Sequence, residues 1–182
     1  FQADYLLMTP PLPQSLALLQ KSNIVLPPDL QSSLEKITYN KCLAVLAYGE
    51  KPSHIPAPGG LNLTGEPLAW LACNQQKGIS PQATAITLHA GKEFSENNWE
   101  NDEQTIVNEL LNFAAPWLGS SVVKYQLHRW RYSQPSQIYP KPYVALTEPA
   151  LILAGDAFMA PKIEGAFLSG LAAAEYLLNK LS

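Results

Sequence analysis

The strongest structural signal in this chain is the stretch Leu151-Ile-Leu-Ala-Gly155-Asp156-Ala-Phe-Met-Ala-Pro161-Lys-Ile-Glu164-Gly165-Ala-Phe-Leu-Ser-Gly170. Its first residues predict a short apolar strand that ends in Gly155-Asp156, and after a brief loop Glu164-Gly165-Ala166 opens a helix that continues to Leu181. The N-terminus of a helix carries unpaired N–H groups and a partial positive charge, and small residues let a ligand approach the backbone. The stretch therefore predicts one side of a site for an anionic or carbonyl-rich ligand.

Composition indicates a globular protein. Of 182 residues, 47% are hydrophobic and 15% are charged, and no apolar run reaches the length of a membrane span. With a net charge of -3, we expect neither nucleic acid nor a membrane as a partner. Cys42 and Cys73 lack metal-ligand spacing and are expected to be buried thiols in a reducing compartment, which favours a cytoplasmic location. The start at Phe1, without a signal peptide, leads us to expect part of a longer protein.

Helix and strand patterns alternate at both ends of the chain but not in the middle. A strand is predicted over 3–8, and Pro13 and Asp29 mark the starts of two short helices. The middle contains strand patterns at 41–48, 68–73, 84–89 and 122–132, and helix patterns at 93–99 and 102–113, the latter capped by Asn101 or Asp102. We predict an α+β fold in which an antiparallel-rich domain, residues 38–134, is inserted between residues 1–37 and 135–182.

The sequence indicates neither a catalytic nucleophile nor a metal centre. The histidines His54, His89 and His128 are dispersed without metal-ligand spacing, and no serine lies in a G-x-S-x-G turn. Catalytic residues therefore stay unassigned. This pattern favours chemistry that is carried by a cofactor, with the protein supplying orientation and electrostatics.

Four stretches together resemble the flavin amine oxidase-type proteins, most closely the renalase-like group. They are Leu-Ala-Gly155-Asp156 with Glu164–Gly170, Ala3-Asp-Tyr with Thr9-Pro-Pro-Leu-Pro-Gln14, Leu88-His89-Ala90, and His128-Arg-Trp-Arg-Tyr132. The resemblance runs over most of the chain and implies a two-domain flavoprotein. Residues 1–37 and 135–182 would then be a remnant of the FAD-binding domain, with its last strand and helix, and residues 38–134 would be the substrate-binding domain.

The resemblance also implies which residues contact the cofactor. Asp156 would hydrogen-bond the ribityl or pyrophosphate part of FAD, although a residue after glycine can also be a simple turn or cap residue. Gly155, Glu164, Gly165 and Ala166 complete the expected cofactor-binding set. The helix N-terminus would point at the pyrimidine end of the flavin, where reduction places negative charge. Glu164 has an alternative role, since a carboxylate in a first helical turn favours the helix dipole.

Three residues are candidates for lining the substrate site. Trp130 and Tyr132 lie two positions apart on one face of a predicted strand, and family members roof the flavin with aromatic residues of this sheet. Ordinary packing on the sheet is the alternative for both rings. His89 ends another predicted strand, where it either lines the site or is a hydrogen-bonded histidine of the core rim.

The chain departs from the family pattern in one respect. It contains no G-x-G-x-x-G turn, and Gly59-Gly60 stands in a proline-rich loop. We therefore expect the C-terminal part of an FAD-dependent oxidoreductase, which alone neither holds FAD tightly nor turns over. The intact enzyme would transfer a hydride from an amine or a dihydronicotinamide-type substrate to flavin, with O2 as the acceptor. Two alternatives stay open, a carotenoid desaturase-like flavin branch and a binding or interaction domain that never contacts FAD; the oligomeric state is not indicated.

Overall fold

The computed structural model describes residues 2–181, and the chain divides into two compact units. Unit 1 consists of Phe1–Asn40 and Tyr132–Ser182, and unit 2 consists of Lys41–Arg131. The chain enters unit 2 within strand β2 (Tyr39–Gly49) and leaves it within strand β6 (Val122–Pro135). Each boundary lies a few residues from the positions 37/38 and 134/135 that the sequence predicts.

Unit 1 is built on a three-stranded sheet with the order β1-β8-β7. Strand β1 (Leu6–Met8) runs parallel to β8 (Leu151–Leu153), and β7 (Val144–Leu146) runs antiparallel to β8. Because β1 and β8 are parallel, their carboxyl ends meet at the same edge of the sheet. The segments that follow Met8 and Leu153 therefore leave the sheet side by side.

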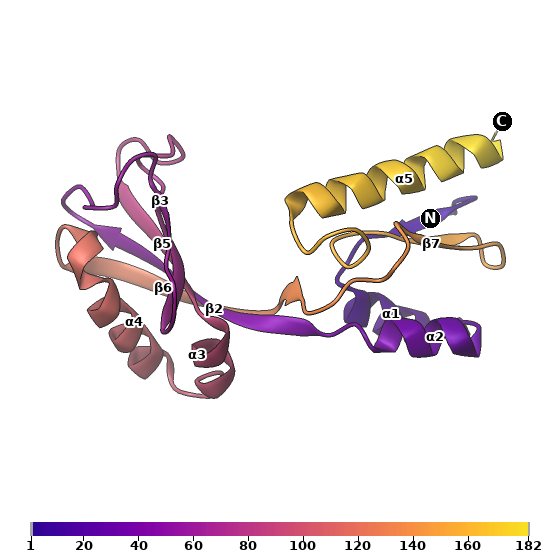
Figure 1. Ribbon diagram of the computed structural model, residues 1–182, viewed down its shortest axis with the longest axis horizontal. Coiled ribbons are helices and arrows are strands. Elements are labelled where there is room, and N and C mark those ends of the chain that lie inside the picture. The colour runs from indigo at the N-terminus through magenta and orange to yellow at the C-terminus, as the bar shows by residue number, and fades with distance from the viewer. Residues whose placement is uncertain (1, 182) are drawn as a thin grey trace. The chain divides into compact units, whose positions relative to one another are not determined.

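Helices cover both faces of this sheet (Figure 1). Helices α1 (Leu12–Lys21) and α2 (Pro28–Glu35) pack on one face, in a core that includes residues of β1, β7 and β8. Helix α5 (Ile163–Leu181) packs on the other face, where Ala173 contacts Ile152 and Ala154 in a smaller core. Burial on both faces explains why Leu151, Ile152 and Leu153 form an unbroken apolar run.

Unit 2 contains a five-stranded sheet with the order β3-β4-β5-β2-β6. Its strands β3 (Gly60–Asn62), β4 (Leu68–Cys73), β5 (Thr84–Ala90) and β2 pair in antiparallel fashion. Helices α3 (Lys92–Asn97) and α4 (Glu103–Leu118) pack on one face of this sheet (Figure 1). The predicted α+β class, with an antiparallel sheet backed by helices, is confirmed.

Several local predictions need correction. The first strand is shorter than predicted and begins at Leu6, after Asp4-Tyr5. Asp29 lies in the first turn of α2 and not at its cap, because Pro27 occupies the cap position. Asp102 does cap α4, but the helix runs on through Pro116 to Leu118, since a proline so near the C-terminus removes only one of the last intrahelical bonds.

Two further predictions concern the cysteines and membrane segments. Cys42 and Cys73 are both buried thiols, as the sequence indicates. Within residues 2–181, no helix combines the length and the apolar character that a membrane crossing requires.

Candidate functional site

Asp156 lies just beyond the carboxyl end of β8, the central strand of unit 1. The backbone N–H of Ala154 donates to the carbonyl oxygen of Met8 at 3.1 Å, which continues the pairing between β8 and β1 to the edge of the sheet. Side chains at the carboxyl edge of a sheet with parallel strands are well placed to contact a ligand. Asp156 is half-buried there, so its carboxylate is accessible in part.

The carboxylate of Asp156 is held by a tyrosine. The Tyr39 hydroxyl donates to Oδ1 of Asp156 at 2.8 Å, and it accepts from the backbone N–H of Leu12, the first residue of α1, at 3.3 Å. The Tyr39 ring lies edge-on to the ring of Tyr132, with 5.8 Å between the centroids. Burial, and then the hydrogen bond to Asp156, raise the pKa of Tyr39, so its phenol is protonated at neutral pH and acts as a donor.

Gly155 adopts a backbone conformation that suits glycine, with φ at 140°. Its N–H donates to the hydroxyl of Ser169 at 2.9 Å, and its carbonyl accepts from the N–H of Phe158 at 3.2 Å. Both backbone groups of Gly155 are therefore engaged within the chain. Because Gly155 has no side chain, a ligand could approach its backbone closely; its expected contact with a cofactor stays a prediction.

Gly165 packs closely against the loop that precedes α5. A Cβ atom at this position would clash with the backbone nitrogen and oxygen of Ala160, in the loop before α5. Backbone atoms cannot move aside as the end of a flexible side chain can. The absence of a side chain at Gly165 therefore lets Ala160 pack against the helix. The expected backbone contact of Gly165 with a cofactor stays a prediction.

Helix α5 begins at Ile163, one residue before the expected start at Glu164. The N–H of Ala166 donates to the carbonyl oxygen of Lys162 at 3.1 Å, inside the first helical turn. The first three N–H groups of an α-helix have no partner within the helix, and here they belong to Ile163, Glu164 and Gly165. The N–H of Ala166 is therefore engaged within the helix. Its expected donation to a cofactor stays a prediction.

The Glu164 side chain is engaged at the protein surface. Its carboxylate lies 2.9 Å from the ammonium group of Lys162, and both side chains are largely exposed. The hydrogen bond and the charge of Lys162 lower the pKa of Glu164. A carboxylate in the first turn also favours the helix dipole, which agrees with the alternative role for Glu164.

His89 lies on β5, on the face of the unit 2 sheet that points away from the helix-covered core. Its ring is stacked at a tilt on Trp70 of β4, with 4.9 Å between the centroids. Lys77 completes the group, since its ammonium lies 5.5 Å from the centroid of the Trp70 ring. Burial, and then the charge of Lys77, lower the pKa of His89, so this imidazole is neutral at neutral pH.

The two expected roof residues on β6 belong to different units. Trp130 lies in unit 2 and is 52% exposed, and its ring packs against the ring of His128 with 4.1 Å between the centroids. Tyr132 lies in unit 1, where its ring contacts Tyr39. The structure thus places Trp130 with the sheet of unit 2 and Tyr132 beside the residue that holds Asp156.

Comparison with known proteins assigns the chain to a family. A family model described as flavin-containing amine oxidoreductase matches residues 1–178. The chain belongs to the flavin-containing amine oxidoreductase family. The resemblance to flavin amine oxidase-type proteins is therefore confirmed at the level of the family.

Two solved structures share the fold. A candidate protoporphyrinogen oxidase from Exiguobacterium sp. 255-15 is 16% identical with a TM-score of 0.63, and a protein from Pyrococcus furiosus is 13% identical with a TM-score of 0.57. Each similarity covers 96% of this chain and 41% of the other. The chain therefore spans about two fifths of the length of these structures, and at such identities the similarity establishes the fold alone.

The donor and acceptor set around Asp156 fits part of a flavin. A carboxylate with one oxygen held by Tyr39 has its other oxygen available to accept from a ribityl hydroxyl. The first N–H groups of α5 suit the carbonyl-rich pyrimidine ring of a flavin. The sequence has no G-x-G-x-x-G turn for a pyrophosphate, so the fit extends to the ribityl and pyrimidine parts.

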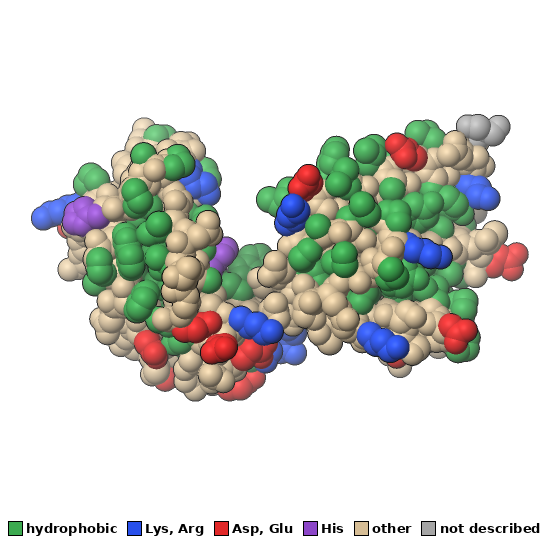
Figure 2. All heavy atoms as spheres, viewed as in Figure 1, with side chains coloured by type: hydrophobic (Ala, Val, Ile, Leu, Met, Phe, Trp, Pro, Cys, Tyr) green, Lys and Arg blue, Asp and Glu red, His purple; other side chains and the backbone are tan. Residues whose placement is uncertain are grey.

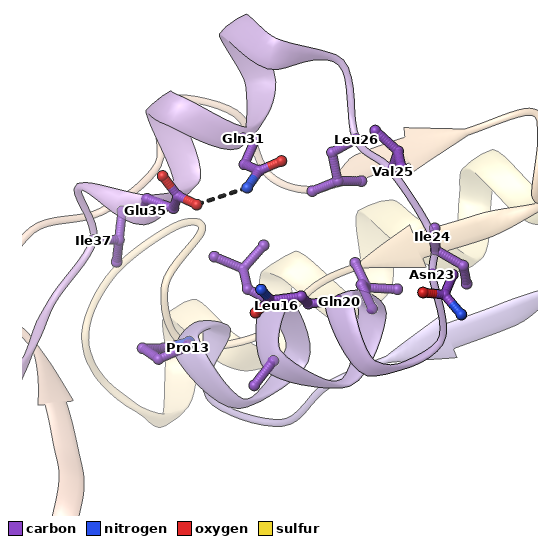
Figure 3. A pocket seen from close by; sticks show the side chains of 12 residues that line it. Pro13, Leu16, Gln20, Asn23, Ile24, Val25, Leu26, Gln31, Glu35 and Ile37 are labelled. Carbon is purple, nitrogen blue, oxygen red and sulfur yellow. Dashed lines mark hydrogen bonds between the residues drawn. The ribbon is translucent and has the colours of Figure 1, made fainter.

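A separate pocket of about 480 Å³ lies between α1 and α2 in unit 1. Figure 3 shows its largely apolar lining, with Leu16 from α1, Val25 and Leu26 from the connecting loop, and a hydrogen bond from Gln31 to Glu35 of α2. None of the expected cofactor or substrate residues lines this pocket. Within residues 2–181, there is also no group of three or more His, Cys, Asp or Glu side chains that could hold a metal ion.

The sequence analysis does not predict the contacts of three residues, Tyr39, Ser169 and Trp70. Tyr39 and Ser169 act through hydrogen bonds to residues that are distant along the chain, Asp156 and Gly155, which no local pattern encodes. Trp70 could have been found from alternation, since it lies one residue before a buried position of β4 and must face away from the core. Its pairing with His89 then follows from the register between β4 and β5.

Proposed function

We propose that this chain carries the flavin-contacting edge and the substrate-binding sheet of an FAD-dependent oxidoreductase that acts on an amine or a dihydronicotinamide-type substrate, as renalase-like proteins do. Membership of the flavin-containing amine oxidoreductase family supports the general class. The observation that carries the proposal is the Asp156 carboxylate, held by Tyr39 at the carboxyl edge of the unit 1 sheet. An acceptor at this position suits the hydroxyl-rich ribityl chain of FAD.

Each unit has its own role in the proposal. Unit 1 would bind FAD through Asp156 and the start of α5, and unit 2 would bind the substrate through its sheet. Bound flavin would accept a hydride from a substrate C–H bond and would pass the electrons to O2. The N-terminus of α5 would stabilise the negative charge that develops on the pyrimidine ring during this step.

The residues of unit 2 suit the recognition of an aromatic or otherwise flat substrate. Trp70, His89 and Trp130 present rings that are not covered by the helices α3 and α4. Because the pKa of His89 is lowered, its ring can pack against a substrate without adding positive charge beside Lys77. The sheet would bind and orient the substrate, and the hydride transfer itself would need no residue of unit 2 to change its protonation.

Flavin content tests the cofactor part of the proposal. The natural protein that contains this chain should show flavin absorbance near about 450 nm, and Asp156→Ala should remove most of it. Asp29→Ala, at an exposed position in the first turn of α2, is the matched control and should keep the flavin. Equal flavin content in Asp156→Ala and Asp29→Ala would remove Asp156 from the cofactor site. We expect the 182-residue chain alone to be colourless, and stoichiometric FAD on it would contradict that expectation.

The reaction is tested by mixing the oxidised protein with candidate donors in the absence of air. Bleaching of the flavin by a dihydronicotinamide compound or by a primary amine, with recovery on admission of O2, is the expected result. Bleaching by neither class would overturn the substrate assignment. The desaturase-like branch would then be tested with long apolar polyenes, and the absence of any flavin would leave a binding domain as the explanation.

A further inference from the structure

We propose that Tyr39 is a positioning residue, which holds the Asp156 carboxylate in the orientation that accepts a hydrogen bond from the ribityl chain of the flavin; this proposal rests on the proposed function. The carrying contact is the 2.8 Å hydrogen bond from the Tyr39 hydroxyl to Oδ1 of Asp156. The two residues are 117 positions apart in the sequence, and both belong to unit 1.

Tyr39 supplies a donor where the backbone offers few. The segment between β1 and α1 contains Pro10, Pro11 and Pro13, and proline has no N–H group. The N–H of Leu12, which lies among these prolines, donates to the Tyr39 hydroxyl at 3.3 Å. The start of α1 therefore reaches Asp156 through the phenol and not through a backbone donor of its own.

The direction of these bonds is set by chemistry. Because the Tyr39 oxygen accepts from Leu12, the hydroxyl hydrogen is left to point at Asp156. An ionised carboxylate only accepts hydrogen bonds, so the proton between Tyr39 and Asp156 belongs to the tyrosine. A ligand that binds the other oxygen of Asp156 must then be a donor, and a ribityl hydroxyl meets that requirement.

Packing keeps the phenol in place. The Tyr39 ring lies partly buried against the core that α1, α2 and the sheet of unit 1 share. The Tyr132 ring meets it edge-on, which restricts its rotation. Because the Tyr39 hydroxyl already holds the Asp156 side chain, this side chain loses less conformational entropy when a ligand binds. Loss of this fixed contact should therefore weaken ligand binding more than loss of a mobile surface contact.

Binding of FAD provides the first test. FAD is titrated into the natural protein after removal of its cofactor, and the Kd is followed by quenching of flavin fluorescence. Tyr39→Phe keeps the ring and removes the hydroxyl, and we expect the Kd to rise about ten-fold, the effect of one hydrogen bond to a charged group. Tyr139→Phe is the matched control, because Tyr139 packs at the edge of the same core, and its Kd should change less than about two-fold.

A double variant separates positioning from a general loss of structure. In an Asp156→Ala background, Tyr39→Phe should change the Kd less than about two-fold, because the group that Tyr39 positions is gone. An equal effect of Tyr39→Phe with and without Asp156 would overturn the proposal, as would a wild-type Kd for Tyr39→Phe alone. If Asp156→Ala itself leaves the Kd unchanged, or the natural protein binds no FAD, the proposed function fails and this proposal fails with it.

A second measurement needs no cofactor. In the 182-residue chain, NMR titration of ¹³Cζ-labelled tyrosines should show an ionisation above the ordinary pKa of tyrosine, and this ionisation should be absent from Tyr39→Phe. Asp156→Ala should move this ionisation toward lower pH, since the carboxylate that favours the protonated phenol is removed. An ionisation of Tyr39 that does not respond to Asp156→Ala would show that the contact is not made, and would overturn the proposal.

Discussion

The backbone N–H of Gly155 and the side chain of Ser169 are joined by a hydrogen bond of 2.9 Å. The Ser169 hydroxyl donates in turn to the carbonyl oxygen of Pro142 at 2.6 Å, and the serine is fully buried. One hydroxyl thus ties the end of β8, the segment before β7 and the middle of α5 together. The position of Asp156, the next residue after Gly155, depends on this link.

Substitution of Ser169 should therefore lower the stability of unit 1. Ser169→Ala leaves the half-buried N–H of Gly155 and the half-buried carbonyl group of Pro142 without their partner, and we expect a loss of about 1–3 kcal/mol in the free energy of unfolding. Ser33→Ala is the control, because the Ser33 hydroxyl bonds a carbonyl on the exposed side of α2; its effect should stay within about 0.5 kcal/mol. Urea unfolding measures both, and equal effects would contradict the assigned role of Ser169.

Two glycines of α5 should respond in opposite ways to alanine. Gly165→Ala places a Cβ against the backbone of Ala160 and should destabilise the protein by about 1–3 kcal/mol. At Gly170 an added Cβ meets nothing within 4 Å, and alanine is the better helix former, so Gly170→Ala should stabilise by about 0.5–1 kcal/mol. Thermal unfolding of both variants checks this, and a stabilised Gly165→Ala would show that the loop does not pack as described.

Local patterns predict much of this fold. Strand β4 has the bounds that its apolar run predicts, because Pro67 and Asn74 end the run on both sides. Asp102 is also recognisable from its neighbours as the cap of α4, since its side chain accepts from the N–H of Thr105 three residues later. These features depend on neighbours in the sequence, which is why the sequence alone is sufficient.

The candidate site is less accessible from the sequence. Asp156 can be proposed from the strand, turn and helix around it, but Tyr39 lies at the start of a distant strand and carries no motif. Gly165 is recognised as a position of close approach, yet the sequence does not reveal that Ala160 is the group that approaches. Contacts between distant segments depend on the whole packing arrangement, and that is fixed only in three dimensions.

The lowered pKa of His89 should make the stability of the protein depend on pH. The unfolded chain binds a proton on this side chain near its ordinary pKa of 6.5, whereas the folded chain binds it only at lower pH. The stability that the neutral His89 contributes to the folded chain is fully present above about pH 6.5 and is lost as the pH falls through the lowered pKa. His89→Gln should flatten this part of the profile of unfolding free energy against pH.

Lys77 provides a second check on His89. Lys77→Ala should raise the pKa of His89 only part of the way toward 6.5, because burial is the larger cause of the shift and remains. NMR titration of the imidazole protons measures both proteins. A His89 that titrates at or above 6.5 in the unmodified chain would contradict the described burial against Trp70.

Helix α5 carries a second apolar face, away from the sheet of unit 1. Ile163, Phe167, Leu171, Leu178 and Leu181 are exposed, with Ile163 at 91% and Phe167 at 68%, and they recur at helical spacing. Figure 2 shows hydrophobic side chains gathered on the visible surface of this helix. A continuous exposed apolar stripe of this kind binds hydrophobic dyes and lowers solubility.

Polar residues on this stripe should change the surface and leave the fold intact. Phe167→Gln with Leu171→Gln should reduce the fluorescence of bound anilinonaphthalene sulfonate and raise the solubility of the 182-residue chain, with little change in unfolding free energy. Leu177→Gln is the control, because Leu177 packs against the sheet, and it should destabilise the protein without reducing dye binding. If the double variant instead unfolds the chain, the two side chains are buried in solution, and the stripe is not the exposed surface described.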